Sequence, residues 1–206
     1  MIKAKITFIS DFHIGSGLGA VYYVDSLFVR DNSHRPYIPG ETIKGIIRDS
    51  CTRIANSLDI PCEDKRGCKC IICELFGREG KAGKLIFSPA YMNSAQESTD
   101  SLVRKRTSIN RETGTAKEHA LFSSEVAFMG SELHFAIRNR NGEMTELQKA
   151  LLMAGILWTR EIGGNRRRGL GHCRMSIVGN EVTKVTDLPT FLKQNLSKTR
   201  TEVANA

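Results

Sequence analysis

The chain has 206 residues, and its apolar fraction of 40% is enough for the core of one large domain or of one domain with insertions. The net charge of +8 favours an acidic partner, either nucleic acid or an anionic surface. No stretch approaches the roughly 18 apolar residues of a membrane helix, and the start of the chain lacks the pattern of a secretion signal. We therefore expect a cytoplasmic protein without a membrane partner. In a reducing compartment its six cysteines favour metal binding or free thiols over disulfides.

The first forty residues alternate between strand-like and loop-like patterns. Lys3–Ile9 alternates apolar and polar residues, which predicts the first strand. Asp11–Ala20 is rich in glycine and is predicted to be a loop, after which Val21–Arg30 alternates again. Asp31–Pro39 has the composition of a turn, and Asp31 itself, like Asp11, is expected to form a turn.

Gly40–Leu58 is predicted to be a helix, because isoleucines recur on one face at helical spacing. Lys44 and Arg48 lie four residues apart and so share another face, while Arg53 points elsewhere. This basic face is either a phosphate-binding surface or simply solvated.

The second half of the chain has further strands and a second helix. Pro61–Gly83 is polar and rich in cysteine, and Met92–Ala120 has no clear apolar period, which is typical of a functional insertion or a mobile arm. The remaining predicted elements are strands at Lys84–Tyr91, Leu121–Phe128 and Glu132–Ile137, a helix at Met144–Arg160, and a last strand region at His172–Val185, before a frayed tail from Ser197.

The order strand, helix, strands, helix, strand predicts an α+β fold with a ferredoxin-like core of split βαβ units. RNA-recognition modules use this architecture, but the chain lacks their aromatic signature, so its sheet is not expected to stack bases. We expect one domain over residues 1–206, with insertions at 61–83 and 92–120.

Glu161–Cys173 reads EIGGNRRRGLGHC and combines glycines with three adjacent arginines. Glycine allows close approach of another backbone, and arginine matches phosphate oxygens two at a time. The segment is therefore predicted to bind a polyanion; the alternative is a solvated basic loop. It does not fit the G-x-G-x-x-G nucleotide fingerprint, because the expected strand and acidic partner are missing. The candidate RNA-binding residues here are Gly163, Gly164, Asn165, Arg166, Arg167, Arg168 and Gly169.

Four cysteines form the pattern C-x5-C-x-C-x2-C at Cys62, Cys68, Cys70 and Cys73. Four thiolates can close a tetrahedral structural zinc site, and a polar insertion with little core gains stability from such a metal. The spacing leaves open whether Cys68 and Cys70 are both ligands and whether His34 substitutes for one; free thiols are the alternative. Cys51 and Cys173 are expected to be buried apolar residues.

Four stretches together resemble a known family. They are FHIGSG at Phe12–Gly17, VDSLFVRDNSHRPYIPGETIKGIIR at Val24–Arg48, CELFG at Cys73–Gly77, and INRETGTAKEHALFSSEVAF at Ile109–Phe128, with the glycine–arginine segment following. In order and spacing they resemble the RAMP superfamily, the guide-RNA-binding proteins of CRISPR systems. Within it the likeness is to the backbone subunit of type III interference complexes.

The resemblance implies a set of partners and residue roles. The partners are guide RNA, single-stranded target RNA, and other RAMP backbone and effector subunits. Asp25 falls on the aspartate that cuts target RNA, with Mg²⁺ or another divalent metal assisting. Lys44 and Arg48 fall on the helix that faces guide phosphates. Arg104 and Arg106, with neighbouring Lys105 and Arg111, fall on the hairpin or thumb that wedges into the guide–target duplex, for which Leu102, Val103 and Ile109 are the apolar candidates.

Three alternatives stay open at this stage. The chain can be a scaffold of the same complex without catalysis, with Asp25 as a turn residue. It can be an endoribonuclease that processes guide precursors without metal, through a histidine such as His13, although a lone histidine is more often structural. It can also be an RNA-binding module outside CRISPR systems.

Overall fold

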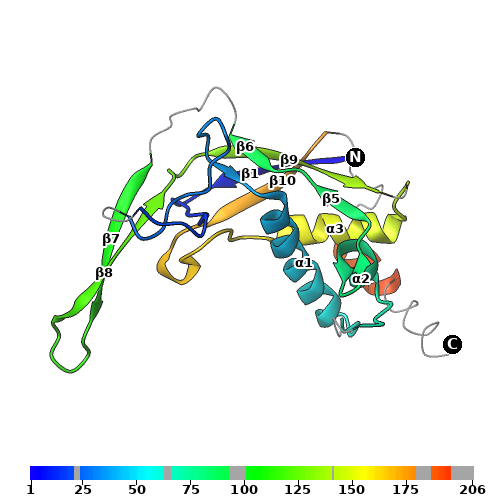
Figure 1. Cartoon of the computed structure of the whole chain (residues 1–206). Coiled ribbons are helices and arrows are strands. Elements are labelled where there is room, and N and C mark those ends of the chain that lie inside the picture. Colours follow the sequence, from blue (N-terminus) through cyan, green and yellow to red (C-terminus); the bar gives the residue numbers. More distant parts are fainter. Residues whose placement is uncertain (21–23, 63–65, 93–100, 141, 180–186, 196–206) are drawn as a thin grey trace.

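The computed structural model describes residues 1–20, 24–62, 66–92, 101–140, 142–179 and 187–195 (Figure 1). One antiparallel sheet and a group of helices form the body, and a long two-stranded hairpin projects from it. The strands are β1 (Ile2–Phe8), β2 (Tyr37–Ile38), β3 (Gly77–Arg78), β4 (Lys81–Ala82), β5 (Leu85–Phe87), β6 (Ala90–Met92), β7 (Leu102–Ile109), β8 (Ala116–Val126), β9 (Glu132–Asn139) and β10 (Cys173–Val178). The helices are α1 (Gly40–Ser57), α2 (Ile71–Phe76) and α3 (Glu146–Trp158), with a 3-10 turn at Arg166–Arg168 and a further helical stretch at 188–195.

The main sheet has the strand order β10-β1-β9-β6-β2, and β5 also pairs with β9. The central strand β1 runs antiparallel to both β10 and β9. Its alternation places Ile2, Ala4, Ile6 and Phe8 in the core, as expected when one face of a strand is covered and the other is not.

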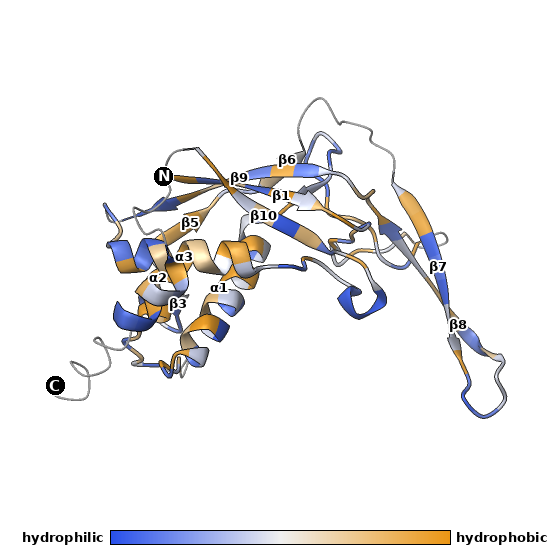
Figure 2. Ribbon diagram, turned by 180° about the vertical axis from the view of Figure 1, so that it is seen from behind, coloured by the Kyte–Doolittle hydropathy of each residue, from blue (hydrophilic) through white to orange (hydrophobic). Residues whose placement is uncertain are grey.

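The described helices cover the same face of the sheet (Figures 1 and 2). α1 packs against α3, and α3 against β10. Gly40, the first residue of α1, lies against β5: a Cβ atom at Gly40 would come within 2.3 Å of the Phe87 carbonyl oxygen, so this contact requires glycine. α3 begins with a capping box between Thr145 and Gln148, which satisfies backbone donors at the helix start.

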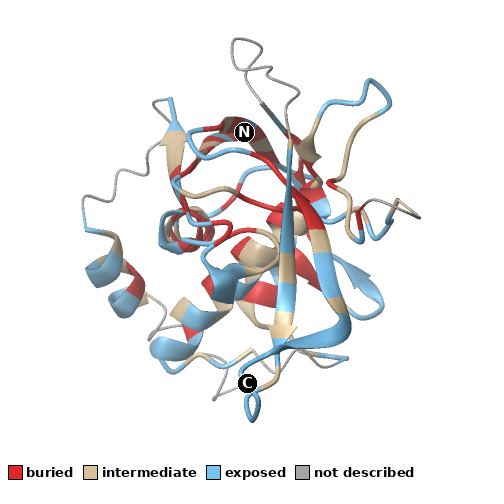
Figure 3. Cartoon of the chain, turned by 90° about the vertical axis from the view of Figure 1, so that its left-hand side faces the viewer, coloured by how far each residue is buried: buried red, intermediate tan, exposed pale blue. Residues whose placement is uncertain are grey.

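The core lies between the sheet and the helices, and the projecting hairpin lies almost entirely outside it (Figure 3). β7 and β8 pair only with each other among the described strands. This hairpin exposes apolar side chains along its length, at Leu102, Val103, Ile109, Leu121 and Phe122. Since a large exposed apolar surface usually marks an interaction site, the hairpin is built to contact something other than its own domain.

The strand, helix and burial patterns of the sequence locate most of these elements. The predicted strand Lys3–Ile9 and helices Gly40–Leu58 and Met144–Arg160 correspond to β1, α1 and α3 within two residues at each end. The alternation of Val21–Arg30 forms isolated bridges over its described part rather than a strand. The hairpin extends to Val126, beyond the expected boundary at residue 120. Residues 180–185 of the last predicted strand and the tail from Ser197 lie outside the described residues.

One helix and one aspartate differ from the sequence predictions. α2 was not predicted, because its six residues are too few to show a helical period; it begins where the Cys70 side chain accepts a hydrogen bond from the Cys73 backbone. Asp11 does not form a local turn, since its carboxylate accepts from the backbone of distant Met129 at 2.8 Å. No described helix has the length and apolar character needed to cross a membrane.

Candidate functional site

Asp25 is exposed, and its carboxylate is held in place from the base of the hairpin. One carboxylate oxygen, Oδ2, accepts hydrogen bonds from the Ser123 backbone N–H at 2.6 Å and from the Ser123 hydroxyl at 2.8 Å. The Ser123 hydroxyl oxygen in turn accepts from the Asp25 backbone N–H at 3.1 Å. The backbone and side-chain hydrogen bonds from Ser123 lower the pKa of Asp25 below its ordinary value, because both stabilise the charged form. The site therefore presents a fixed, ionised carboxylate to solvent.

Glu125 anchors the segment that carries Asp25. Its Oε2 accepts from the Phe28 backbone N–H at 2.8 Å, and its Oε1 accepts from Arg30 and from the Ser101 hydroxyl. Burial works to raise the pKa of Glu125, but the hydrogen bonds from Ser101, Arg30 and Phe28 outweigh it and the net pKa is lowered. A buried, ionised glutamate thus ties residues 26–30, which directly follow Asp25, to β8.

His13 is buried beneath the same region and both its ring nitrogens have partners. Nδ1 contacts the Glu125 carbonyl oxygen, and Nε2 lies 3.0 Å from the Ser26 hydroxyl. The backbone oxygen of His13 accepts from the Gly164 N–H at 2.8 Å. The His13 imidazole therefore links the segment that carries Asp25 to β8, and the His13 backbone links both to the glycine–arginine segment.

The glycine–arginine segment packs against the body at one end and exposes its arginines at the other. Gly163 has a φ of 100°, and a Cβ atom there would lie 2.3 Å from the His13 carbonyl oxygen, so the packing of this segment against His13 requires glycine. Asn165 and Gly169 flank the 3-10 turn in the left-handed conformation. The three arginines of that turn, Arg166, Arg167 and Arg168, are exposed.

Arg104, Arg106 and Arg168 gather where the hairpin meets the glycine–arginine segment. Arg104 forms an ion pair with Asp11, and Arg106 donates to the Ser124 hydroxyl. The Nε of Arg106 is buried and has no hydrogen-bond partner among the described residues. Burial, followed by the charges of Arg168 and Arg104, lowers the pKa of Arg106. Close like charges destabilise one another, and Asp11 partly offsets them through its ion pair with Arg104.

The two sides of the hairpin base carry different groups. Lys105 is directly opposite Ser123 in the β7–β8 register, and Arg104 is opposite Ser124. Residues directly opposite share a face of the sheet. The face with Ser123 therefore carries Asp25 and Lys105, and the other face carries the arginine cluster.

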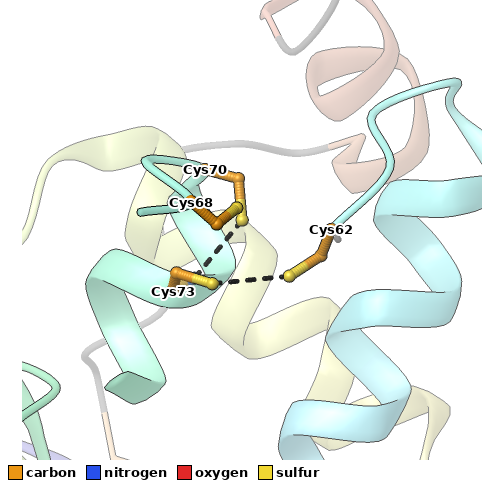
Figure 4. A group of neighbouring side chains, drawn as sticks. All are labelled: Cys62, Cys68, Cys70 and Cys73. Atoms are coloured by element: carbon orange, nitrogen blue, oxygen red, sulfur yellow. Dashed lines mark hydrogen bonds between the residues drawn. The ribbon is translucent and has the colours of Figure 1, made fainter. Parts of the chain in front are cut away.

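The four predicted zinc ligands come together in space (Figure 4). The sulfur atoms of Cys62, Cys68, Cys70 and Cys73 all lie within 4.8 Å of one another, and the Cys62 and Cys73 sulfurs are 3.5 Å apart. Tetrahedral zinc with Zn–S bonds of about 2.3 Å requires sulfurs about 3.8 Å apart, so the cluster fits such an ion with little adjustment. Burial, with the neighbouring thiols adding to it, raises the pKa of Cys70 to about 11, which a bound cation would reverse. His34 is not part of this group.

The remaining sequence candidates lie on α1 and in the core. Lys44 and Arg48 are half-buried on one face of α1 and line the same cavity. Burial, then the charges of Arg48 and Arg140, lowers the pKa of Lys44. Arg53 instead pairs with Asp49 on the solvent side. Cys51 and Cys173 are fully buried, as predicted.

Several functional candidates escaped the sequence analysis. Ser123 holds Asp25 from 98 residues away, and Arg30 reaches Glu125 across 95 residues. No periodicity or spacing signals such long-range pairs. Asp31, by contrast, forms the local turn expected of it, since its Oδ1 accepts from the backbone of Ser33 and Arg35 at 2.9 Å each.

Comparison with known proteins gives consistent matches in sequence and in structure. A family model of the RAMP superfamily matches residues 5–174. The chain is 29% identical over 199 residues to the CRISPR system Cms endoribonuclease Csm3 of Streptococcus thermophilus, covering 83% of this chain and 87% of the relative.

Two solved chains share the fold at low sequence identity. One belongs to the type III-B Cmr-beta complex in the apo state, with a TM-score of 0.65, 12% identity, and coverage of 88% of this chain and 98% of the other. The second belongs to the type III-B Cmr-beta complex bound to cognate target RNA, with a TM-score of 0.63, 14% identity, and coverage of 85% and 96%.

Proposed function

The chain belongs to the RAMP superfamily, and from that premise we propose that it is a guide-RNA-binding backbone subunit of a type III CRISPR interference complex. The name of the Streptococcus thermophilus relative describes a CRISPR endoribonuclease, and the similar solved chains come from a type III-B Cmr-beta complex, in one case bound to cognate target RNA. Along the chain, α1 lies between β1 and β6, and α3 lies between β9 and β10. Together with the sheet order β10-β1-β9-β6, this arrangement supports the ferredoxin-like split βαβ core.

The observation that carries the proposal is the gathering of Arg104, Arg106 and Arg168 at the hairpin base. Two segments that are far apart in sequence, the hairpin and the glycine–arginine turn, bring Arg106 and Arg168 near enough for the charge of Arg168 to lower the pKa of Arg106. The Arg106 Nε donor there lacks a partner among the described residues. A guide-strand phosphate would supply an acceptor for the Arg106 Nε donor and would add negative charge to a cluster in which Asp11 pairs with Arg104 alone among the described ion pairs. Binding of this kind reads the backbone and leaves sequence to base pairing.

The exposed hairpin extends this surface toward a duplex. Its apolar residues Leu102, Val103 and Ile109 are exposed, and apolar side chains of this kind act as wedges between base steps in other nucleic-acid-binding proteins. We assign them the local unstacking of the guide–target duplex, next to the face that carries Asp25.

Asp25 is the residue to which we assign target cleavage. In this reaction the 2′-oxygen of the target loses its proton to solvent and bonds to the adjacent phosphorus, while the P–O5′ bond breaks and the leaving 5′-oxygen takes up a proton from solvent. The products are a 2′,3′-cyclic phosphate and a 5′-hydroxyl, so the protein must position the 2′-oxygen and stabilise charge on the phosphate. The lowered pKa of Asp25 makes it a weak base at neutral pH, because an efficient general base has a pKa near the working pH. Its ionised carboxylate suits a divalent cation such as Mg²⁺, which takes carboxylate and phosphate oxygens and, when bound, would stabilise charge on the phosphate. A target with 2′-deoxyribose at the reacting nucleotide should therefore resist cleavage.

The rival functions differ in what they require of Asp25 and His13. A scaffold without catalysis needs the arginine cluster but not Asp25. A precursor-processing enzyme that acts through His13 needs an accessible imidazole, whereas His13 is buried with both ring nitrogens engaged. The described geometry therefore favours a backbone subunit over a processing enzyme.

Salt-dependent binding of guide RNA tests the proposal. Replacing Arg166, Arg167 and Arg168 by alanine should weaken binding and lower the slope of log K against log salt by up to about two, at roughly 0.7 per single-strand phosphate contact. A control that removes the same charge at Lys3, Arg53 and Lys149, away from the cluster, should change the slope little. Equal slopes for wild type and both variants would refute the phosphate role of the turn.

A further inference from the structure

Lys105 lies across the β7–β8 hairpin from the serine that holds Asp25. It is directly opposite Ser123 in the β7–β8 register, and the Ser123 hydroxyl donates to Oδ2 of Asp25 at 2.8 Å. Side chains directly opposite each other in an antiparallel pair share a face, with Cβ atoms about 4.5–5.5 Å apart. Because the Lys105 ammonium stands on a long, flexible stem, it can reach the space in front of the Asp25 carboxylate.

The arginines on either side of Lys105 serve the opposite face of the hairpin. Successive side chains of a strand point to opposite faces, and Arg104 and Arg106 have their partners on that other face. Both arginines are also paired with β8 in the register, so the ladder fixes the backbone at Lys105. Of these three consecutive cations, the strand therefore directs Lys105 toward Asp25 and the two arginines away from it.

The charge of Lys105 is available to a bound ligand. Its side chain is exposed, and none of the ion pairs among the described residues involves it. Glu125, which shares its face of the hairpin, pairs with Arg30 instead, and the Asp25 carboxylate is held by Ser123. Since Lys105 and Asp25 share a face without forming an ion pair, a phosphate group can lie between them.

We propose that Lys105 is a second catalytic residue of the cleavage site, whose ammonium stabilises negative charge on the target phosphate as the strand is cut. This inference rests on the proposed function, because it takes the substrate to be the RNA phosphodiester next to Asp25. An ammonium group has three N–H donors and no acceptor. One of these donors hydrogen-bonds a non-bridging oxygen of the phosphate, on the side away from the Asp25 carboxylate.

Lys105 acts on charge and leaves the proton balance of the reaction unchanged. The 2′-oxygen gives its proton to solvent and bonds to phosphorus, the P–O5′ bond breaks, and the leaving 5′-oxygen takes a proton from solvent. The ammonium keeps its own proton throughout. Because negative charge on the phosphate oxygens changes during this displacement, a donor aimed at one of them can bind the transition state more tightly than the uncut target.

The test uses the assembled complex with target RNA bound to saturation and follows the single-turnover rate of the cut opposite this subunit. Loss of one such donor in an enclosed active site slows a reaction about 10²- to 10³-fold. Lys105 is exposed, so Lys105→Gln should slow the cut about 10- to 100-fold, with target affinity nearly unchanged. Lys105→Arg keeps the charge and should restore most of the rate. Lys117→Gln removes the same charge toward the tip of the hairpin, next to the pair Ala116 and Ile109, and should cut as wild type does.

A target with sulfur at one non-bridging oxygen tests the contact itself. Sulfur is a weak hydrogen-bond acceptor, so with one of the two diastereomers the wild type should lose the contribution of Lys105. Lys105→Gln has no such contribution to lose, and its rate should fall less with the same diastereomer. A lysine that only supports the fold of the hairpin would give equal sulfur effects in wild type and variant, and that result overturns the assignment.

The Asp25→Ala complex separates this inference from the proposed function. If Asp25→Ala still cuts, the proposed cleavage site fails, and the role of Lys105 in it fails too. If Asp25→Ala stops the cut and Lys105→Gln cuts as wild type does, the function stands and Lys105 is not catalytic. A loss confined to target affinity, or a loss of rate that Lys105→Arg does not relieve, also overturns the assignment, because Lys105 would then supply binding or shape rather than charge in the transition state.

Discussion

The buried carboxylate of Glu125 gives the sharpest stability prediction, because one side chain joins three parts of the molecule. Glu125→Gln keeps the shape of the side chain but replaces one acceptor oxygen by an N–H₂ donor. In the wild type, one oxygen accepts from the Phe28 backbone at 2.8 Å and the other from Arg30 and Ser101. Both carboxylate oxygens accept hydrogen bonds, so in either orientation the amide N–H₂ group faces a donor and leaves that donor without its acceptor.

The size of the effect follows from how far each partner is buried. The Glu125 side chain is 9% exposed and that of Arg30 is 24% exposed. Breaking a fully buried pair costs about 3–5 kcal/mol, and leaving a buried donor such as the Phe28 N–H unsatisfied costs about 1–3 kcal/mol. Because Arg30 can turn toward water, we expect a loss of about 2–3 kcal/mol for Glu125→Gln. In a chain of this size, that lowers the melting temperature by about 5–10 °C.

Denaturant and thermal unfolding of the two proteins measure this loss directly. Glu132→Gln is the matched control, because Glu132 makes an exposed ion pair with Lys5 and such pairs contribute little. Equal effects of the two substitutions would show that the Glu125 network does not anchor the segment that carries Asp25.

The same network predicts a dependence on pH. The folded-state pKa of Glu125 is lowered below the ordinary value of 4.5, so its contribution is fully present above about pH 4.5 and is lost as the pH falls through the folded pKa. The stability difference between wild type and Glu125→Gln should therefore be constant near neutrality and shrink in acid. A difference that grows as the pH falls would contradict the assigned protonation state.

Three further predictions concern the metal, the arginine cluster and the hairpin. Purified protein should hold about one zinc per chain. Cys73→Ser should lower the metal content and speed proteolysis around α2, whereas the control Cys173→Ala should keep the metal. Clean protein without zinc in elemental analysis would exclude the site. Asp11→Asn keeps the acceptor for the Met129 backbone but removes the charge paired with Arg104, so guide RNA should bind several-fold more tightly at low salt; weaker binding would mean that Asp11 positions Arg104 for RNA rather than competing with it. Leu102→Ser with Val103→Ser should leave guide affinity nearly unchanged. The same double variant should reduce the fluorescence of 2-aminopurine placed at the unstacked target nucleotide, because stacking quenches this base. Unchanged fluorescence would rule out these residues as the wedge.

The sequence predicted the parts of the fold that depend on local pattern. The alternation in β1 and the apolar stripe of α1 follow from which face each element buries, so their positions could be read directly. The cysteine spacing likewise predicted a cluster that the structure brings together, because its ligands lie close in the chain.

What the sequence could not show depends on contacts across the fold. The position of Asp25 depends on Ser123, and the environment of Arg106 depends on Arg168. Arg78 and Lys81 lie on the short strands β3 and β4 and Arg140 follows β9, and all three line a cavity with Lys44 only in the folded chain. The sequence also did not show that the backbone approaching Gly163 is that of His13, whose carbonyl oxygen occupies the space of the missing side chain. In each case the sequence showed the type of the residue but not which residue it contacts in the fold.

Cleavage of guide-paired target RNA by the assembled complex tests the central claim most directly. With Asp25→Ala, the cut opposite this subunit should disappear while guide and target binding stay intact, because Asp25 is exposed and its carboxylate contacts only Ser123 among the described side chains. Asp31→Ala is the matched control, since Asp31 forms a turn with Ser33 and Arg35, and it should cut as wild type does. Normal cleavage by a fully assembled Asp25→Ala complex would contradict the catalytic assignment and leave a guide-binding scaffold.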